Sequence, residues 1–349
     1  MLALRKIRPE FGAALEEIAA PPAPPAPGMV RLRVAAAGIC GSDLHAYEWS
    51  AGYEFMAPLL PLTIGHEFSG RVAAVGAGVE GFAPGDPVTC WPTVACGHCA
   101  GCAAGRPDEC RARRIIGLHR DGGFAEVIDI PAATCFALPP GLPLDLAALT
   151  EPLAVAVNAV DLAEAGPGDA VAVLGPGPIG LAAAWVAQAR GAEVLVAGHD
   201  DALRLDCARR LGLKHTADLA QETLAEAARR VFGREADRVI EATGHAPVVA
   251  EALGILRPRG ILVVAGIHSR PAQIDLTRLV REKKQIRGAH DTTAPAFREA
   301  IALLAARGAE LAPMITNRRP LSEAVAAFEA ARRRTAVKVL LIPGLEGTR

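Results

Sequence analysis

The stretch Ala170-Val-Ala-Val-Leu-Gly175-Pro-Gly177-Pro-Ile-Gly180 decides the fold of this chain. Its first five residues are apolar and predict a buried strand, and a helix-like run follows from Ile179 to Arg190. A Gly-x-Gly-x-x-Gly loop between a strand and a helix is typical of a dinucleotide pyrophosphate site, although a glycine-rich turn in an α/β core is the alternative. The expected cofactor contacts in this loop are Gly175, Gly177, Pro178, Ile179 and Gly180.

The segments around this loop indicate the fold class. Short apolar runs and helix-like runs alternate from about residue 152 to residue 288, for example Glu193–Ala197, Ala202–Leu211 and Ile261–Ala265. Such alternation predicts an α/β fold with a parallel, doubly wound sheet. The first 150 residues read instead as short strands and loops, so we expect a second, mostly β part there.

The end of the second expected strand bears on which dinucleotide binds. An acidic residue commonly ends this strand in NAD sites, whereas an arginine nearby suits the 2′-phosphate of NADP. Gly198 stands at this position, Asp200 follows two residues later, and Arg204 lies close by. We expect Asp200 and Arg204 to contact the cofactor, as well as Gly266 after the run Ile261–Ala265, and favour NAD over NADP.

Four cysteines form a compact group in a glycine-rich segment, with the spacing Cys96-x2-Cys99-x2-Cys102-x7-Cys110. Four thiolates complete a tetrahedral site and leave no open position, which predicts a structural zinc ion. An iron–sulfur cluster is the alternative, but the bacterial ferredoxin run continues with x3-Cys-Pro, whereas this chain continues with x7-Cys110-Arg111.

A second group of possible ligands is more dispersed. It comprises Cys40, the pair His66-Glu67 and Glu151, which precedes Pro152. Thiolate, imidazole and carboxylate ligands together suit a catalytic zinc ion with one open position. Taken singly, each of these residues has an ordinary structural interpretation as well, such as a buried thiol or a core histidine.

Composition limits the other classes of function. The net charge is −1 over 349 residues, which gives no electrostatic case for binding nucleic acid or an anionic membrane. No apolar signal segment is seen near Met1, and the uncharged stretch Ala170–Ala189 is broken by glycine and proline, so we expect no membrane span. Eight cysteines in such a chain indicate metal ligands in a reducing compartment, and we expect a cytoplasmic protein.

Taken together, these motifs resemble the zinc-dependent medium-chain alcohol dehydrogenases, in particular their polyol and L-threonine dehydrogenase-like branch. The matching segments run through the whole chain: Cys40-Gly-Ser42-Asp43, Gly65-His66-Glu67, Gly85-Asp86-x-Val88, the four cysteines, Asp121–Glu126, Glu151-Pro152 and Gly175–Gly180.

The resemblance implies a domain organisation and a set of cofactors. A mostly β, GroES-like catalytic domain would cover residues 1–153 and 290–349, with a structural-zinc lobe at about 90–112. A Rossmann dinucleotide-binding domain would cover residues 154–289. Each chain would bind two zinc ions and NAD or NADP, and would assemble into a homotetramer or homodimer.

The resemblance also assigns the ligands of the catalytic zinc. Cys40 and His66 would bind it, and Glu67 and Glu151 are both candidates for the remaining carboxylate position. Asp43 would orient one of the ligands from behind.

The implied reaction is hydride transfer between a secondary alcohol and the nicotinamide ring. Ser42 stands where the family has the hydroxyl that bonds the substrate oxygen, and His45 stands where many members pass the proton to solvent. Zinc would make the alcohol proton acidic enough to leave, and the cofactor would carry out the redox step.

The substrate is less well specified, within the classes of polyol, diol and hydroxy amino acid. The stretch Cys40–Trp49, with its aromatic pair Tyr47 and Trp49, resembles the threonine dehydrogenase branch, but Thr93 takes the place of a histidine of that branch. The loop Asp291–Thr293 lacks the arginine that sorbitol-type enzymes carry there. Trp49–Met56 is expected to line the pocket opposite Leu118-His119, which favours a partly apolar alcohol or ketone. Alternatively, Tyr47 and Trp49 are packing residues.

The same motifs are also compatible with two other functions. One is an NADPH-preferring carbonyl reductase of the same family, which cofactor preference at residues 198–204 would distinguish. The other is a non-catalytic protein that binds a nucleotide as a sensor; loss of Cys40, His66 or Ser42 would favour it, and all three are present.

Overall fold

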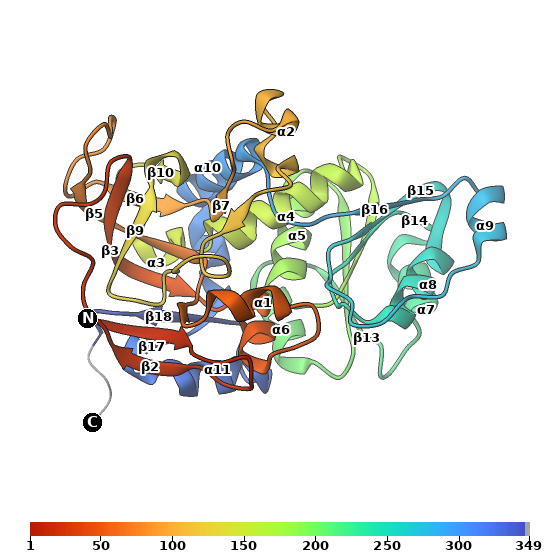
Figure 1. Ribbon diagram of the computed structural model, residues 1–349. Coiled ribbons are helices and arrows are strands. Elements are labelled where there is room, and N and C mark those ends of the chain that lie inside the picture. The colour runs from red at the N-terminus through yellow and green to blue at the C-terminus, as the bar shows by residue number, and fades with distance from the viewer. Residues whose placement is uncertain (346–349) are drawn as a thin grey trace. The chain divides into compact units, whose positions relative to one another are not determined.

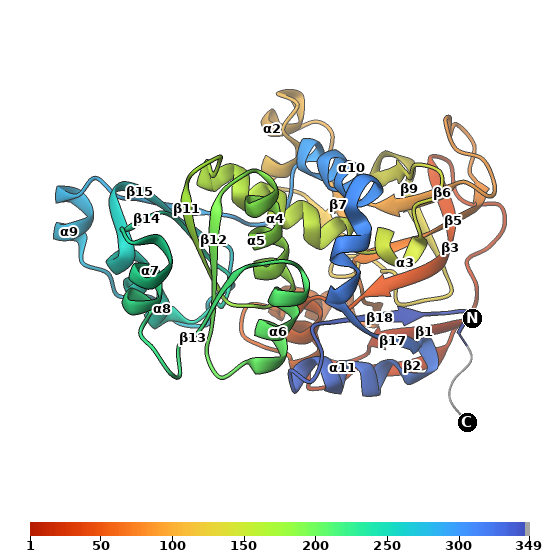
Figure 2. The same cartoon turned by 180° about the vertical axis from the view of Figure 1, so that it is seen from behind.

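The computed structural model describes residues 1–345, and the chain divides into two compact units (Figures 1 and 2). The first unit contains Met1–Glu151 and Thr293–Arg349, and the second contains Pro152–Thr292. No helix within the described residues is both long and apolar enough to cross a membrane.

The first unit is built mainly from antiparallel strands. Its strands are β1 (Leu2–Lys6), β2 (Ala14–Glu17), β3 (Met29–Gly38), β4 (Leu62–Thr63), β5 (Glu67–Val75), β6 (Pro87–Cys90), β7 (Thr93–Val94), β8 (Arg114–Ile115), β9 (Val127–Pro131), β10 (Cys135–Ala137), β17 (Ile315–Pro320) and β18 (Lys338–Ile342). Its helices are α1 (Gly41–Glu48), η1 (Glu54–Leu59), α2 (Ala100–Ala103), η2 (Pro107–Glu109), η3 (Ala132–Thr134), α3 (Leu144–Ala147), α10 (Ala294–Leu311), η4 (Ala312–Met314), η5 (Leu321–Glu323) and α11 (Ala324–Arg332).

The largest sheet of this unit joins the two ends of the chain. Its strands run in the order β10-β6-β5-β3-β18-β17, and β9 also pairs with β3. Strand β18 is antiparallel to β3, with Leu340 opposite Gly38 and Leu341 opposite Ala37. In β3, Val30, Leu32 and Val34 are buried, which is the alternation expected of a sheet with one face on the core. This pairing brings the C-terminal strand beside the residues that precede α1.

The second unit is a parallel sheet with helices. Its strands are β11 (Ala170–Leu174), β12 (Glu193–Gly198), β13 (His215–Asp218), β14 (Ala236–Glu241), β15 (Leu256–Val264) and β16 (Gln285–Gly288). Its helices are α4 (Thr150–Ala163), which begins just before the unit, α5 (Pro178–Ala189), α6 (Ala202–Arg210), α7 (Leu224–Phe232), α8 (Ala246–Ile255) and α9 (Leu276–Arg281).

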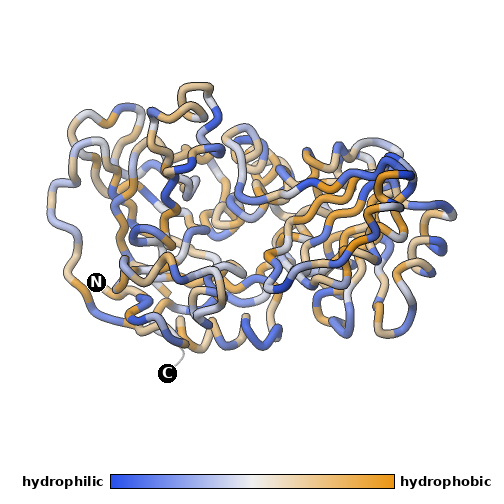
Figure 3. The backbone as a smooth tube through the Cα atoms, turned by 45° about the vertical axis from the view of Figure 1, so that its right-hand side comes forward, coloured by the Kyte–Doolittle hydropathy of each residue, from blue (hydrophilic) through white to orange (hydrophobic). Residues whose placement is uncertain are grey.

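The order of these strands is β13-β12-β11-β14-β15-β16, and every pair is parallel. All five residues of β11 are buried, as expected for a central strand covered on both faces, and the strands of this sheet form an apolar band in Figure 3. This order is that of the doubly wound dinucleotide-binding fold, whose ligand lies at the carboxyl ends of the strands where the order reverses. The predicted α/β fold with a parallel doubly wound sheet and a second, mostly β part is therefore confirmed.

Several elements differ from the sequence-based expectation. The helix-like run Ala220–Phe232 is one of the alternating segments that predict the α/β fold, but α7 begins only at Leu224, after the capping box of Thr223 and Glu226. The preceding strand β13 was not predicted, since His215–Asp218 contains polar residues at three of its four positions. Helix α1 was also not predicted.

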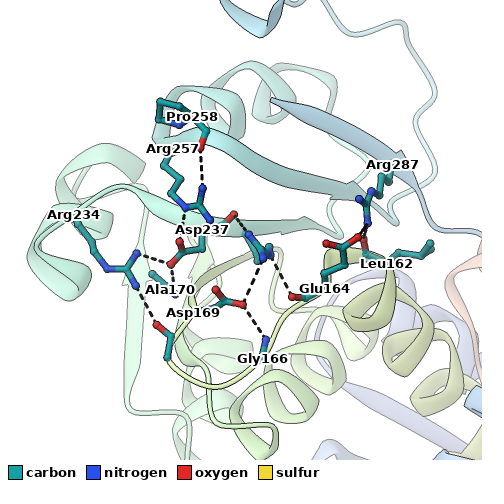
Figure 4. A network of polar contacts seen from close by, with 12 residues as sticks. Leu162, Glu164, Gly166, Asp169, Ala170, Arg234, Asp237, Arg257, Pro258 and Arg287 are labelled. Atoms are coloured by element: carbon teal, nitrogen blue, oxygen red, sulfur yellow. Dashed lines mark hydrogen bonds and ion pairs between the residues drawn. The ribbon is translucent and has the colours of Figure 1, made fainter. Parts of the chain in front are cut away.

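Asp237 is the centre of a polar network at the amino end of the parallel sheet (Figure 4). Its Oδ2 accepts from the Ala170 backbone N–H at 2.9 Å and from Arg234, and its Oδ1 accepts from the Arg257 guanidinium at 2.5 Å. Burial alone would raise the pKa of Asp237, but these donors together lower it from the ordinary 3.8. The carboxylate thus joins β14 to β11 and β15.

Asp237→Ala is expected to lower the free energy of unfolding by about 2 kcal/mol, since the Ala170 N–H loses its acceptor while the two arginines can turn to water. Because the folded pKa lies below the unfolded value, the unfolded chain binds more protons as the pH falls. The contribution of Asp237 is therefore present above about pH 5 and disappears in acid. Urea unfolding at pH 7 and pH 3.5 would test both points.

Asp206→Ala provides the control for this experiment. Asp206 pairs with Arg209 and Arg210 at an exposed position, and such surface pairs contribute about 0–1 kcal/mol. Equal losses in the two variants, or a loss in Asp237→Ala that persists at pH 3.5, would contradict the role given to Asp237.

Candidate metal centres and dinucleotide site

The first unit brings three predicted ligands together. Cys40 precedes α1, His66 follows Gly65, and Glu67 begins β5. One ligand atom of each residue lies within 4.8 Å of the others. Gly65 has φ +99° and a Cβ there would lie 2.7 Å from the Phe124 ring, so this close turn before His66 requires glycine.

Asp43 orients two members of this group. Its Oδ2 accepts from the Cys40 backbone N–H at 2.9 Å, and its Oδ1 lies 3.2 Å from His66 Nδ1. The contact with Asp43 favours a proton on Nδ1, which leaves Nε2 as the ligand atom. Ser42 Oγ lies 3.2 Å from His66 Nε2, so the predicted substrate-contacting hydroxyl is beside the same atom.

Lys338, at the start of β18, lies behind this group and was not identified from the sequence. Its Nζ forms a buried ion pair with Glu67 Oε2 and donates to the Ile39 carbonyl at 3.0 Å. A Cβ at Gly38 would lie 2.3 Å from Glu67 Oε2 and 2.9 Å from the Lys338 side chain, so only glycine at position 38 leaves room for the pair.

The electrostatics of the cluster fit a divalent cation. In the metal-free protein, burial and then the charge of Glu67 raise the pKa of Cys40. Burial would lower the pKa of His66, but Asp43 and then Cys40 raise it well above 6.5. In the form that binds a metal, with Cys40 ionised and His66 neutral, Glu67, Asp43, Cys40 and Lys338 together carry two net negative charges, which a divalent cation would neutralise. Glu67 Oε1 is also buried with no hydrogen-bond partner among residues 1–345.

Glu151, the other candidate carboxylate, is not part of this group of mutually close ligand atoms. It lies at the start of α4 and is largely buried. Its charge nevertheless contributes, after that of Glu67, to raising the pKa of Lys338. The geometry groups Glu67, rather than Glu151, with Cys40 and His66.

A row of aromatic rings lies beside α1. The ring centroid of His45 is 5.7 Å from that of Tyr53, Tyr53 is 5.8 Å from Phe55, and Phe55 stacks on His119 at 4.7 Å. His45 Nδ1 lies 3.3 Å from Ser50 Oγ. Phe55, within the expected pocket segment, thus lies against His119 and is 41% exposed.

Two aromatic residues of the expected pocket are packing residues instead. Tyr47 is buried between Phe11 and Phe328, with ring centroids at 5.0 and 5.1 Å. Trp49 packs against the same core and lies under the Lys6 ammonium at 5.3 Å. The structure therefore favours the packing alternative for both residues, because their rings are packed in or against the hydrophobic core of this unit.

The four cysteines of the expected zinc lobe also lie together, with one sulfur atom of each within 4.8 Å of the others. Backbone N–H groups of His98 and Cys99 lower the pKa of Cys96 to about 6, so its thiolate is favoured at neutral pH. The Cys96 N–H donates to Cys110 Sγ at 3.3 Å. Four thiols on one short loop, with amide donors aimed at the sulfur atoms, fit a closed tetrahedral zinc ion.

In the second unit, the three glycines of the loop have the three expected environments. Gly175 has φ +99°, and its Cβ would lie 2.8 Å from the Thr243 methyl group. A Cβ at Gly180 would lie 1.9 Å from the Gly175 carbonyl, whereas Gly177 faces open space. Pro178 and Ile179 begin α5, whose first backbone N–H groups have no partner within the helix. The loop therefore fits a pyrophosphate.

The residues expected near the ribose do not place an acidic side chain at the end of β12. Gly198 ends β12, and a Cβ there would lie 2.9 Å from Pro176, so the backbone leaves no room for an acidic side chain. Asp200 is exposed with φ +49°, while Arg204 lies within α6 and pairs with Asp201 at 3.4 Å. Gly266 lies in the loop after β15.

Comparison with known proteins identifies the family. The sequence model of the alcohol dehydrogenase GroES-like domain matches residues 26–140, and that of the glucose dehydrogenase C-terminus matches residues 144–342. A sorbitol dehydrogenase from Halalkalibacterium halodurans is 34% identical, over 91% of this chain and 93% of its own length. An L-threonine 3-dehydrogenase from Deinococcus deserti is also 34% identical, over 91% and 92%.

Comparison with solved structures points to the same family. A zinc-binding dehydrogenase from Sinorhizobium meliloti 1021, bound to NADP, superimposes with a TM-score of 0.88 at 32% identity and covers 98% of this chain and 99% of its own. The chain therefore belongs to the zinc-dependent medium-chain alcohol dehydrogenases, in the polyol and L-threonine dehydrogenase-like branch, and is an oxidoreductase that transfers a hydride between a secondary alcohol and a nicotinamide dinucleotide.

Proposed function

We propose that Cys40, His66 and Glu67 hold the catalytic zinc ion, that Cys96, Cys99, Cys102 and Cys110 hold a structural one, and that the substrate is a secondary alcohol or diol with an apolar flank. The observation that carries the proposal is the Cys40–His66–Glu67 group with Ser42 Oγ 3.2 Å from His66 Nε2. In this proposal the first unit is the catalytic domain and the second unit, Pro152–Thr292, is the dinucleotide-binding domain.

The residues around this group supply a route for a proton. Ser42 and His45 are three residues apart on α1, which places them on one face of the helix. In this route Ser42 Oγ would accept the proton of the substrate hydroxyl as its own hydroxyl proton moves on to His45, which would release a proton to solvent. A zinc ion held by the three ligands would act as a Lewis acid and lower the pKa of that hydroxyl. A nicotinamide dinucleotide bound at Gly175–Gly180 would accept the hydride.

Ser42→Ala is expected to lower kcat by about 100-fold to 10,000-fold, the range that a positioned proton-transfer group supplies. The zinc content and the thermal unfolding temperature should stay unchanged, because Ser42 only contacts His66 through its hydroxyl. Steady-state kinetics with metal analysis would test this. Ser50→Ala, which removes only the neighbour of His45, is the control and should reduce kcat much less.

The aromatic row of His45, Tyr53, Phe55 and His119 supports a substrate that is partly apolar. The test is turnover by the zinc-loaded enzyme with 2,3-butanediol, 2-butanol, sorbitol, galactitol 1-phosphate and L-threonine. We expect the diol or the simple alcohol to give the highest kcat/KM. Preference for the phosphate ester or for threonine by tenfold or more would contradict the proposed substrate class.

An NADPH-preferring carbonyl reductase is a second candidate function, and one observation favours it. Gly198 ends β12 against Pro176, so no carboxylate at that position can repel a 2′-phosphate. Under this alternative the kcat/KM for NADPH with a ketone would exceed that for NAD+ with the alcohol. A preference for NAD+ over NADP+ of tenfold or more would exclude it and would support the NAD assignment made from the sequence.

We also propose that the chain is a cytoplasmic homo-oligomer. Strand β16 is at the edge of the parallel sheet, and the apolar side chains of Leu276, Val280 and Ile286 near it are 62%, 69% and 39% exposed. A second copy of this chain could cover them, and eight free thiols suit a reducing compartment. Light scattering on Val280→Asp should report a smaller species than the wild-type protein; an unchanged mass would argue against this surface.

A further inference from the structure

A buried carboxylate marks the end of β14 in the second unit. Glu241 is fully buried, and its Oε1 accepts from the backbone N–H groups of Thr243 at 2.6 Å and Gly244 at 2.9 Å. The Thr243 hydroxyl donates to the same oxygen atom. The carboxylate therefore holds the turn that follows β14 in one conformation, through charge-assisted hydrogen bonds.

His268, which belongs to a different segment, contacts the second oxygen atom of this carboxylate. It lies in the loop after β15, is largely buried, and its Nε2 is 2.9 Å from Glu241 Oε2. The loop also packs closely on the turn after β14: a Cβ at Gly266 would lie 2.3 Å from the Gly244 backbone N, and a Cβ at Gly244 would lie 2.4 Å from the Ile267 carbonyl. The two segments are thus interlocked, and Glu241 with His268 is their polar connection.

The strand order shows which part of a dinucleotide these segments would face. In a sheet of order β13-β12-β11-β14-β15-β16, one mononucleotide lies over the half that contains β11 to β13, and the other lies over the half that contains β14 to β16. The loop Gly175–Gly180 follows β11 and would receive the pyrophosphate. The carboxyl ends of β14 and β15 therefore belong to the half that takes the nicotinamide and its ribose. Gly175 also lies close to this region, since a Cβ added at this glycine would be only 2.8 Å from the Thr243 methyl group.

We propose that His268 is a positioning residue for the nicotinamide end of the cofactor. It holds Glu241 in place, and Glu241 in turn fixes the shape of the interlocked segments Thr243-Gly244 and Gly266–His268. The inference rests on the proposed function only in that a nicotinamide dinucleotide binds to this unit. His268 acts through the shape of the two segments rather than through the reacting atoms.

The test compares the whole cofactor with a fragment of it. Titration calorimetry would measure Kd for NADH and for ADP-ribose, which lacks only the nicotinamide, or for NADPH and 2′-phospho-ADP-ribose if those bind better. In His268→Leu, Kd for the whole cofactor should rise at least tenfold, while Kd for the fragment should change less than twofold. His268→Gln should recover most of the affinity, because its amide can donate to Glu241.

Two further variants keep the test decisive. Glu241→Gln preserves size but removes the charge that accepts four hydrogen bonds, so it should show the same selective loss as His268→Leu. His215→Leu, at the start of β13, is the control and should leave both Kd values unchanged. Equal weakening of cofactor and fragment, or no weakening of either, would overturn the proposal. Failure of the wild-type protein to bind any dinucleotide would instead refute the proposed function on which it rests.

Discussion

Cys40→Ser is expected to lower kcat/KM by at least about a thousandfold, because Lewis-acid activation of the alcohol contributes several kcal/mol to the barrier. The same variant should contain one zinc ion per chain instead of two. Its thermal unfolding temperature should change little, since Lys338 still pairs with Glu67 and Asp43 still contacts His66. Metal analysis, steady-state kinetics and circular dichroism on one preparation would test all three expectations.

Cys102→Ser is the matched control for that variant. It removes one of four thiols on a short lobe that has few buried apolar residues, and a structural zinc ion contributes folding free energy directly. We expect local unfolding of the lobe and a clear loss of thermal stability. Equal losses of stability in Cys40→Ser and Cys102→Ser would contradict the division into a catalytic and a structural metal site.

The second large effect is expected for Lys338→Met in the metal-free protein. This change leaves the buried carboxylate of Glu67 without its cation, and breaking a buried ion pair costs about 3–5 kcal/mol. With zinc bound, the metal compensates the same charge, so the loss of stability should be much smaller. The zinc affinity of the variant should accordingly be higher than that of the wild-type protein.

Urea unfolding with zinc and with a chelator would measure this difference. The double variant Lys338→Met/Glu67→Gln should regain most of the stability lost in the chelated protein, because no buried charge remains unpaired. Lys284→Met is the control, since Lys284 is a buried lysine of the second unit that pairs with Glu282 and donates to the Leu253 carbonyl. Its effect should be the same with and without zinc; a Lys338→Met effect that is also independent of zinc would contradict the coupling.

Much of the second unit could be predicted because its signals are local. The strand Ala170–Leu174 and the glycines that follow it have a period and spacing that few other structures satisfy. Strand β13 was missed because His215–Asp218 has no apolar run, and it forms only because β12 offers a parallel edge. Helix α1 was missed because its polar residues Ser42, Asp43 and His45 have no helical apolar period, as happens where a segment serves a site rather than the core.

The sequence alone determined the kind of chemistry: the four-cysteine lobe, the pair His66-Glu67 and the loop Gly175–Gly180 are each defined by residues close together in the chain. It left open whether Glu67 or Glu151 belongs with Cys40 and His66, and it did not indicate any role for Lys338 or His268. Only the tertiary structure groups Glu67 with Cys40 and His66, brings Lys338 to Glu67 through the pairing of β18 with β3, and brings His268 to Glu241 through the packing of the loop after β15. Buried charges must be compensated by whichever groups the fold brings near, and sequence spacing carries no record of that proximity.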